Sequence, residues 1–416
     1  MKLLNYAMQR FVKTGRLRII DADGKQHEYG STPQPSVTIR LTDRRLHHAL
    51  FFNPELRAGE AYMDGTLVIE EGTLRDLLML YALNRTNLRS QPVQRMLRAS
   101  YKKFRGLTQR NVAARARKNV AHHYDLSNEL YELFLDSDLQ YSCAYFLKPG
   151  DSLETAQRNK LRHIAAKLAL KPGQRVLDIG SGWGGMAMYL AEAAQVDVTG
   201  VTLSLEQYEL ATKRAHERGL ADRVRFELKD YRDVTAKFDR IVSVGMFEHV
   251  GVGHYGEFFA KVSSLLADDG VALLHSIGRK GGPGSTGPWM RKYIFPGGYA
   301  PALSETLAAI EGSGLWVTDI EVLRLHYAQT LLEWERRFQE NRGKIAALLD
   351  ERFCRMWEFY LIGCEFSFRF GKQMVFQIQL AKNVGTLPLD RGYMAAAETA
   401  LSHELRHDIH SLPDRI

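Results

Sequence analysis

The segment best suited to bind a ligand is a short apolar run that ends in an acid and continues into glycines. Glycine lets the backbone approach a ligand closely and adopt positive φ, and residues 186–192 that follow have helical spacing. The segment therefore predicts a strand, a glycine-rich turn and a helix, which is the local arrangement of a nucleotide-binding loop. It reads Arg175-Val-Leu-Asp178-Ile-Gly180-Ser-Gly182-Trp-Gly184-Gly185.

Asp178 distinguishes this loop from a dinucleotide site. A dinucleotide site receives a pyrophosphate at the helix N-terminus and usually has G-x-G-x-x-G spacing, whereas here an acid precedes a G-x-G-x-G-G run. A carboxylate would repel a pyrophosphate, but it suits a cationic ligand. The sequence therefore favours S-adenosylmethionine, which carries amino and sulfonium groups, over a dinucleotide or an ordinary glycine-rich turn.

The next two strands offer polar residues for the rest of such a donor. The strand 196–202 ends without the acid that often holds ribose hydroxyls, and Thr202 and Gln207 are the available substitutes. Thr202 could instead cap the following helix, with Glu206 nearby. After the third strand, Asp230 could accept from the adenine amino group, and the ring of Tyr231 could lie on the adenine face.

Two titratable residues stand at the ends of the following strands. Glu248, with His249 beside it, follows the apolar run 239–245, and His275 ends the run 270–276. A carboxyl group that faces inward there would be partly desolvated and shifted toward its neutral form. Beside a donor site the two could act as an acid–base pair, although each taken singly could be a structural residue.

Alternating strands and helices must position these residues. This alternation is typical of a mainly parallel sheet with helices on both faces, and ligands then bind outside the C-terminal ends of the strands. The last strand alternates in period two and could be an antiparallel edge. The expected strands are 175–179, 196–202, 223–228, 239–245, 270–276, 315–323 and 374–381.

The 416 residues exceed what one core usually organises. Residues 1–85 mix β-like pieces at 16–20 and 36–41 with a helix at 73–82, which predicts a small α+β domain. A basic helical connector at 86–120 and a catalytic domain at 121–416 follow. The chain lacks a long apolar span and a signal peptide, and Cys143, Cys354 and Cys364 lack metal-site spacing. We expect a cytoplasmic chain that binds no metal.

The net charge of +8 is concentrated between Leu77 and Tyr124, where no acid occurs and basic residues recur from 85 to 118. Such a block can bind nucleic acid or an anionic membrane surface, or it can be a solvated helix face. Apolar residues at helical spacing between the basic ones favour the membrane, where each Lys or Arg contributes roughly 1 kcal/mol. No asparagine-proline-proline-aromatic motif follows the fourth strand, which argues against a nucleic-acid methyltransferase.

Ordered motifs extend over most of the chain. They are Gly59-Glu-Ala-Tyr-Met-Asp-Gly65, His123-Tyr-Asp-Leu-Ser-Asn128, Gln140-Tyr-Ser-Cys143-Ala-Tyr145, the glycine loop, Thr202-Leu-Ser-Leu-Glu-Gln207, Met246-Phe-Glu-His-Val-Gly251, His275-Ser-Ile-Gly278, Ile294-Phe-Pro-Gly-Gly298 and His326-Tyr327-Ala-Gln-Thr330. With these motifs the chain resembles the bacterial cyclopropane-fatty-acyl-phospholipid synthases and, more distantly, the mycolic acid cyclopropane synthases. The resemblance implies a Rossmann-like class I S-adenosylmethionine-dependent methyltransferase fold with a seven-stranded mostly parallel sheet. It also implies a homodimer that associates peripherally with the inner face of the membrane.

The implied reaction transfers a methylene group from S-adenosylmethionine to the cis double bond of an unsaturated acyl chain in a membrane phospholipid. Attack of the alkene on the sulfonium methyl leaves a cation, and a base must remove a proton before the cyclopropane ring closes. Water would trap the cation, so the pocket must be closed and apolar. In the family the base is bicarbonate, and its holders correspond to Cys143, Glu248, His275, the backbone of Ile277, and Tyr327. The implied donor contacts are Tyr141, Ser142, Asp178, Gly180, Gly182, Gly184, Thr202, Gln207, Asp230 and Tyr231.

The sequence is compatible with more than one interpretation of the site and of the product. Bicarbonate beside an ionised glutamate would be repulsive, so we expect either a protonated Glu248 or a charged His275. Methylation followed by a hydride shift would give a methyl- or methylene-branched chain instead of a ring. Ser181 stands where the family often has cysteine, and we expect donor binding to survive this difference. The segment 278–300 could be a lid, a membrane-dipping element or an ordinary surface excursion. The aromatic residues after 356 are expected to line the core and an acyl tunnel.

Overall fold

The computed structural model describes residues 1–90, 96 and 127–410. Most of the predicted basic connector 86–120 and the first four residues of the motif His123–Asn128 lie outside these described residues. The chain divides into two compact units and passes between them several times. The first unit holds residues 1–108, 284–298 and 331–373, and the second holds 109–283, 299–330 and 374–416. Two segments of the expected catalytic region, 284–298 and 331–373, therefore fold with the N-terminal residues.

The second unit is built on a seven-stranded sheet in the order β10-β11-β9-β8-β5-β6-β7. β5 to β9 pair in parallel, and β10 and β11 pair antiparallel. All seven expected strands are confirmed within a few residues. Their bounds are β5 Arg175–Ile179, β6 Asp197–Thr202, β7 Val224–Leu228, β8 Phe238–Val244, β9 Leu266–Arg279, β10 Trp316–Leu323 and β11 Gln373–Ala381.

The expectation that the last strand is an edge is wrong. β11 lies between β9 and β10, and β10 is the edge strand at this end of the sheet, with Trp316 54% exposed. The alternating polar residues of β11 suggested a solvent-facing side, but Gln377 and Gln379 are each only 1% exposed. These glutamines make hydrogen bonds inside the unit, so the period of two reflects a buried polar row.

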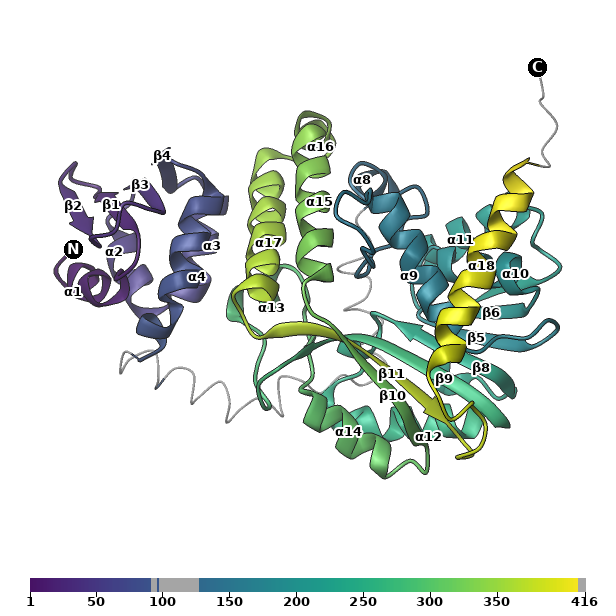
Figure 1. Cartoon of the computed structure of the whole chain (residues 1–416). Coiled ribbons are helices and arrows are strands. Elements are labelled where there is room, and N and C mark those ends of the chain that lie inside the picture. The colour runs from purple at the N-terminus through teal and green to yellow at the C-terminus, as the bar shows by residue number, and fades with distance from the viewer. Residues whose placement is uncertain (91–95, 97–126, 411–416) are drawn as a thin grey trace, which may run out of the picture. The chain divides into compact units, whose positions relative to one another are not determined.

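Helices cover both faces of this sheet, as Figure 1 shows, with α9, α10 and α18 on one face and α12 and α14 on the other. Neighbouring strand residues alternate between the two buried clusters: Val176 packs with the first group and Leu177 with the second. This burial on both faces explains the continuous apolar runs of the parallel strands. The helices are α8 Asn128–Glu132, α9 Leu153–Lys167, α10 Gly185–Ala194, α11 Leu205–Glu217, α12 Tyr255–Leu265, α14 Leu303–Glu311 and α18 Gly392–His410, with short 3-10 turns at Tyr231–Asp233, Phe247–His249 and Val252–His254.

The first unit contains a four-stranded sheet in the order β2-β1-β3-β4 and a set of helices. The expected strands 16–20 and 36–41 are confirmed, and the expected helix 73–82 is the first part of α4. The elements are α1 Lys2–Phe11, β1 Arg16–Ile20, β2 Gln26–Tyr29, β3 Ser36–Leu41, α2 Arg45–Phe52, α3 Pro54–Met63, β4 Leu67–Glu71, α4 Leu74–Ser90, α13 Pro288–Tyr293, α16 Arg342–Leu348 and α17 Glu351–Arg369. α15, His326–Glu340, begins in the second unit and ends in the first. None of the helices described in either unit has the length and apolar character needed to cross a membrane.

The segment expected to be a lid or membrane-dipping element carries α13, which packs inside the first unit. Trp289 is 4% exposed, and its Nε1–H donates to the Met63 sulfur at 3.3 Å. A Cβ on Gly59 would lie 2.5 Å from the Trp289 ring, so the glycine makes room for the indole. Buried Glu60 binds Lys292 at 2.6 Å and accepts from the Tyr293 hydroxyl at 2.9 Å. Trp289 is therefore a core residue, and a membrane-dipping role for it is wrong.

Replacing Trp289 with alanine should destabilise the first unit, because a large cavity would open beneath α3. We expect a loss of about 3–5 kcal/mol, which for a unit of this size lowers Tm by about 6–20 °C. Differential scanning calorimetry measures the change. Trp316→Ala on the exposed face of β10 is the matched control and should shift Tm little. A Trp289→Ala protein as stable as that control would show that the indole does not support this packing.

Candidate active site

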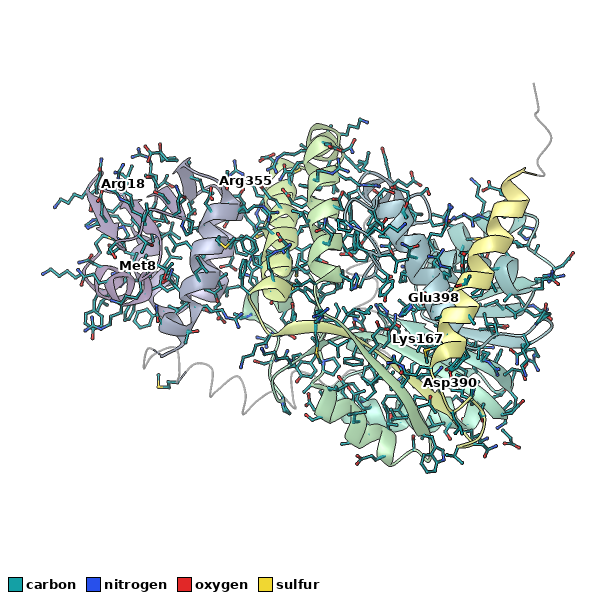
Figure 2. All side chains as sticks on the ribbon, viewed as in Figure 1. Met8, Arg18, Lys167, Arg355, Asp390 and Glu398 are labelled. Atoms are coloured by element: carbon teal, nitrogen blue, oxygen red, sulfur yellow. The ribbon has the colours of Figure 1, made fainter. Side chains whose placement is uncertain are left out.

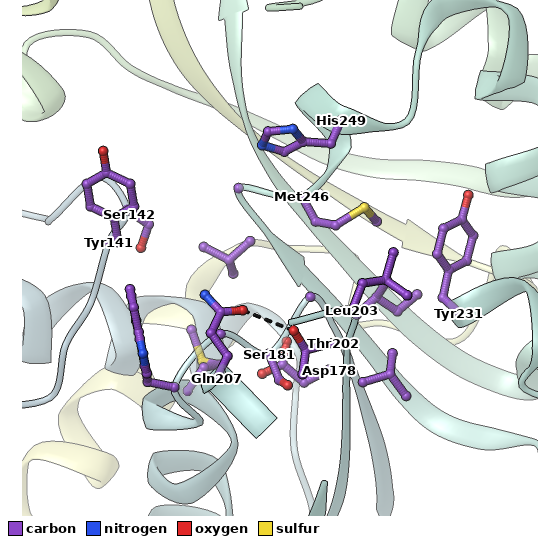
Figure 3. A pocket seen from close by; sticks show the side chains of 18 of the residues that line it. Tyr141, Ser142, Asp178, Ser181, Thr202, Leu203, Gln207, Tyr231, Met246 and His249 are labelled. Atoms are coloured by element: carbon purple, nitrogen blue, oxygen red, sulfur yellow. Dashed lines mark hydrogen bonds between the residues drawn. The ribbon is translucent and has the colours of Figure 1, made fainter. Parts of the chain in front are cut away.

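A pocket opens at the C-terminal ends of the parallel strands of the second unit. The structure brings nine of the ten expected donor residues to it: Tyr141, Ser142, Asp178, Gly180, Gly182, Thr202, Gln207, Asp230 and Tyr231. Six of them are labelled in Figure 3, which shows their side chains around the pocket: Tyr141, Ser142, Asp178, Thr202, Gln207 and Tyr231. The tenth, Gly184, does not line the pocket; it caps α10 at φ +82°, and a Cβ there would lie 2.5 Å from Phe226.

The glycines of the loop have distinct roles. Gly180 has φ +83°, and a Cβ there would lie 2.7 Å from the Met246 Cβ, so it allows two loops to approach closely. Gly182 has φ +53°, and its Cβ would meet no described atom within 4 Å, so it faces the open pocket. The first glycine brings the β5 and β8 loops together, and the second leaves the pocket floor open for a ligand.

Asp178 lies at the base of this pocket and is 1% exposed. Its Oδ2 has no hydrogen-bond partner among the residues that the structure describes, and neither has the nearby Ser181 Oγ. Burial raises the pKa of Asp178 to about 7, and the charge of Lys160 opposes that rise. An ionised carboxylate that lacks a direct partner is a site that a ligand ammonium group can satisfy.

Lys160, on α9, supports the pocket and was not predicted from the sequence. It is fully buried, and its ammonium donates to Ser142 Oγ at 3.0 Å and to Gln140 Oε1. Burial lowers its pKa to about 8, although Asp136 and Cys143 counter the effect. Lys160 thus fixes the Gln140–Ser142 loop against α9. Its charge also acts on Asp178, Cys143 and His275, which connects the donor pocket to the expected catalytic group.

Thr202 and Gln207 bind one another at the pocket wall. The Thr202 hydroxyl donates to Gln207 Oε1 at 3.0 Å, which orients the amide so that its nitrogen points away from Thr202 (Figure 3). The suggestion that Thr202 caps the next helix is wrong, because Ser204 is the N-cap of α11 and accepts from the Gln207 backbone N–H at 3.3 Å. A hydroxyl and an amide therefore stand at the expected ribose position.

Asp230 is held by Arg232, which also lines the pocket. Its Oδ1 accepts from the Arg232 backbone N–H at 3.0 Å and from Nε at 2.9 Å, and Oδ2 accepts from Nη2 at 2.5 Å. These bonds fix the turn that follows β7 and present the Tyr231 ring, which packs edge-on against Phe258 at 5.5 Å. The expected contact from Asp230 to an adenine amino group would have to share this carboxylate with Arg232.

Glu248 and Ile277 of the expected catalytic group are in direct contact. Glu248 Oε1 accepts from the Ile277 backbone N–H at 2.6 Å, while Oε2 is buried and has no hydrogen-bond partner in the part of the chain that the structure describes. Burial raises the pKa of Glu248 to about 7, against the lowering effect of Ile277. The Ile277 amide therefore orients the carboxyl group, and a neutral Glu248 carries an O–H that can donate.

His275 lies two residues before Ile277 on β9, so both side chains leave the same face of the strand. His275 is 2% exposed and pairs with Val244 of β8. Its backbone carbonyl accepts a hydrogen bond from the Gly245 backbone N–H at 3.0 Å. Burial lowers its pKa to about 3, so the ring is neutral at neutral pH. Of the two expectations stated for this pair, the pKa directions favour a protonated Glu248 over a charged His275.

One hydrogen bond links the segments that carry Cys143 and Tyr327. The Ala144 backbone N–H donates to Thr330 Oγ1 at 3.0 Å, and Thr330 lies on α15 nearly one turn after Tyr327, which is 7% exposed. Cys143 is completely buried, and burial raises the pKa of its thiol. It is therefore a thiol at neutral pH, which argues against a nucleophilic role.

Sequence reasoning also missed Gln140, Trp183, Met246 and His249, which line the pocket. Trp183 stands inside the glycine motif and His249 beside Glu248, so proximity to each motif was an available signal. Burial lowers the pKa of His249 to about 4. Lys160 had no such signal, because its partners lie about twenty residues earlier in the chain.

Comparison with known proteins shows which group this chain matches. A family model described as mycolic acid cyclopropane synthetase matches residues 111–378, and a model described only as a domain of unknown function matches residues 7–91. A probable fatty acid methyltransferase of Pseudomonas putida is 37% identical over 88% of this chain and 92% of its own length. The cyclopropane-fatty-acyl-phospholipid synthase of Escherichia coli K12 is 45% identical over 63% of this chain and 67% of its own.

A solved structure of a mycolic acid cyclopropane synthase is also similar to this chain. The mycolic acid cyclopropane synthase CmaA1, complexed with S-adenosylhomocysteine and CTAB, is 35% identical, covers 64% of this chain and 97% of its own, and has a TM-score of 0.60. The second unit has the class I S-adenosylmethionine-dependent methyltransferase fold, as expected. With the sheet, the glycine-loop pocket and these matches in agreement, the chain belongs to the mycolic acid cyclopropane synthetase family, as its sequence motifs predicted.

Proposed function

We propose that this enzyme transfers a methylene group from S-adenosylmethionine to the cis double bond of unsaturated acyl chains in membrane phospholipids and forms a cyclopropane ring. S-adenosylmethionine-dependent modification of acyl chains is the activity that its family supports. The observation that carries the proposal is the donor pocket with its unsatisfied Asp178, next to a dry group of hydrogen-bond donors around Glu248 and His275.

The donor pocket fits S-adenosylmethionine. When bound, this molecule supplies an electrophilic methyl group on a sulfonium. Asp178 Oδ2 would accept from its ammonium group, Gln207 and Thr202 would bind the ribose hydroxyls, and Tyr231 would cover the adenine. Lys160 and the Gln140–Ser142 loop hold the wall of the pocket.

The second group fits a bound bicarbonate, because Glu248 Oε2 is a buried atom without a described partner. When bound, the anion supplies a base for the proton that must leave before the ring closes. The groups expected to hold it are Cys143, Glu248, His275, Ile277 and Tyr327. At neutral pH the pKa directions keep Cys143 a thiol and His275 an uncharged ring. Burial raises the pKa of Glu248 to about 7, and when this carboxyl group is neutral an anion would meet O–H, N–H and S–H donors without an opposing carboxylate.

The same residues exclude water. Cys143, Glu248 and His275 are each no more than 8% exposed, and none of them needs solvent to satisfy a charge. A carbocation formed on an acyl chain would react with water to give an alcohol, so a dry site is a requirement of the chemistry. Burial therefore serves two purposes: it keeps the anion holders neutral, and it protects the reactive chain.

A branched product is the second candidate. The relative named a probable fatty acid methyltransferase aligns with this chain over 92% of its own length. The relative named a cyclopropane-fatty-acyl-phospholipid synthase aligns over 67% of its own length. The first methyl transfer is common to both reactions. They diverge when a hydride shift precedes proton loss, which gives a methyl- or methylene-branched chain.

The proposed place of action is the cytoplasmic face of the membrane, where the enzyme binds peripherally as a homodimer. The net charge of +8 supports attraction to anionic phospholipids. The expected domain roles follow the same proposal, with residues 1–85 associated with lipid, 86–120 as the basic connector and 121–416 carrying catalysis.

The test is incubation of the purified full-length protein with S-adenosylmethionine and vesicles of a cis-monounsaturated phosphatidylglycerol. We expect cyclopropyl proton signals to replace vinyl signals in the NMR spectrum of the extracted lipid. Vesicles with saturated chains are the control and should remain unchanged. Zwitterionic vesicles should be modified more slowly if the anionic surface matters. A methylene or methyl-branch signal would select the second candidate, and an unchanged lipid in the presence of bound donor would contradict both.

A further inference from the structure

Gln377, on β11, joins the expected catalytic histidine to a buried lysine. Its Nε2 lies 3.2 Å from His275 Nδ1, and its Oε1 lies 2.8 Å from Lys167 Nζ. All three side chains are nearly inaccessible to solvent, at 1–2% exposure. The family motifs in the sequence do not include Gln377, and its partners lie 102 and 210 residues away in the chain.

The order of donors along this chain of hydrogen bonds is fixed by chemistry. A lysine ammonium has three N–H donors and no acceptor, so the Gln377 atom that faces Lys167 must be the carbonyl oxygen. The amide nitrogen then faces His275, and an amide nitrogen only donates. His275 Nδ1 must therefore offer its lone pair, and the proton of the neutral ring must be on Nε2.

Lys167 is itself anchored, which keeps the amide from turning over. Its ammonium binds Glu321 of β10, and the same carboxylate oxygen contacts His163 Nε2 at 2.7 Å. The other nitrogen of His163 binds Glu398 of α18. Lys167 and Glu398, both labelled in Figure 2, come from helices on one face of the sheet. The orientation of Gln377 thus depends on a network that spans α9, β10, β11 and α18.

We propose that Gln377 is a positioning residue that locks His275 in the Nε2–H tautomer, so that the ring donates a hydrogen bond from the nitrogen opposite Gln377. The tautomer follows from the hydrogen bonds alone. Its use as a donor to the catalytic anion rests on the proposed function. Gln377 itself acts only through His275.

The tautomer can be observed in the unmodified enzyme. Full-length protein labelled with ¹⁵N-histidine should show, in a long-range ¹H–¹⁵N NMR experiment, a His275 signal with an unprotonated Nδ1 and a protonated Nε2. His275→Gln identifies the signal by its disappearance. Gln377→Glu should invert the pattern, because a carboxylate only accepts and requires the proton on Nδ1. A wild-type spectrum with a protonated Nδ1 would overturn the proposal without reference to activity.

A kinetic comparison tests the positioning role. Gln377→Met removes the amide at similar volume and should lower kcat about tenfold or more with an unchanged KM for S-adenosylmethionine, because a misplaced ring proton costs at least one good hydrogen bond. Gln379→Met is the matched control: Gln379 is equally buried on the same strand but donates to the Lys167 carbonyl and the Tyr393 hydroxyl, not to His275. Equal kcat values for the two variants would refute the role. An enzyme that shows the predicted tautomer but makes no modified lipid would instead refute the proposed function.

Discussion

Glu248→Ala should lower kcat by about 10²- to 10⁴-fold, the usual contribution of a group that assists proton transfer, while binding of the donor is retained. Glu248 does not line the donor pocket, so its loss should leave that site intact. The loss has two physical causes. The Ile277 amide loses its acceptor at 2.6 Å, and the anion site loses a buried O–H. Single-turnover kinetics and calorimetric titration with S-adenosylhomocysteine would separate the two quantities.

The glutamine variant of the same residue, Glu248→Gln, is the sharper test. Its side-chain amide can still accept from Ile277 and donate from its nitrogen, but it cannot ionise. In the wild type, burial raises the pKa of Glu248 to about 7, so the neutral form dominates below that pH and is lost as the pH rises through it. At saturating S-adenosylmethionine, wild-type kcat should therefore decline on the alkaline side, and the decline should be absent in Glu248→Gln. Identical profiles in shape and height would show that ionisation of Glu248 does not matter.

Asp178→Asn should weaken donor binding by about 10- to 100-fold, the size expected when a buried hydrogen bond to a charged group becomes a neutral one. Asparagine has nearly the same shape, so the strand and the glycine turn should be preserved. Asp197→Asn, at the exposed start of the neighbouring strand β6, is the matched control. Calorimetric titration of both variants with S-adenosylhomocysteine gives the comparison.

The pH dependence of binding adds a second readout for Asp178. Its pKa is raised to about 7 by burial, so the carboxylate that a ligand ammonium requires is present above that pH and is protonated below it. Wild-type affinity should rise as the pH increases through 7, and the asparagine variant should not follow. An asparagine variant with wild-type affinity at high pH would exclude an ionised Asp178 from donor binding.

The sheet of the second unit could be predicted because its strands are apolar on both faces and are separated by helices. β11 was misplaced at the edge because buried glutamines look like solvent-facing residues in a sequence. In the first unit, β2 and β4 escaped prediction because both are short, and β2 consists mainly of polar residues. The packing of α13 on α3 depends on contacts about 230 residues apart, which no local pattern encodes.

The site likewise contains residues that the sequence predicts and residues that it does not. The glycine loop and the strand ends could be predicted because a residue at the C-terminal end of a parallel strand necessarily reaches the ligand edge. The buried polar and charged residues that support these elements could not be predicted. Lys160 belongs to a helix that is polar along much of its length, and only the folded chain shows that it is buried beside Ser142. The role of Gln377 depends on its contact with His275, which lies 102 residues earlier in the chain.

The first unit is built from segments that lie far apart in the chain, and this limits how the protein can be truncated. Helix α17 places Ile362 and Phe366 against Leu74 of α4, and Tyr62 donates to Glu358 at 2.8 Å. A fragment that started after residue 108 would expose this apolar seam and leave Glu358 without its phenol partner. Recombinant expression of such a truncated catalytic region should therefore give aggregated material, even though every residue of the donor pocket would still be encoded.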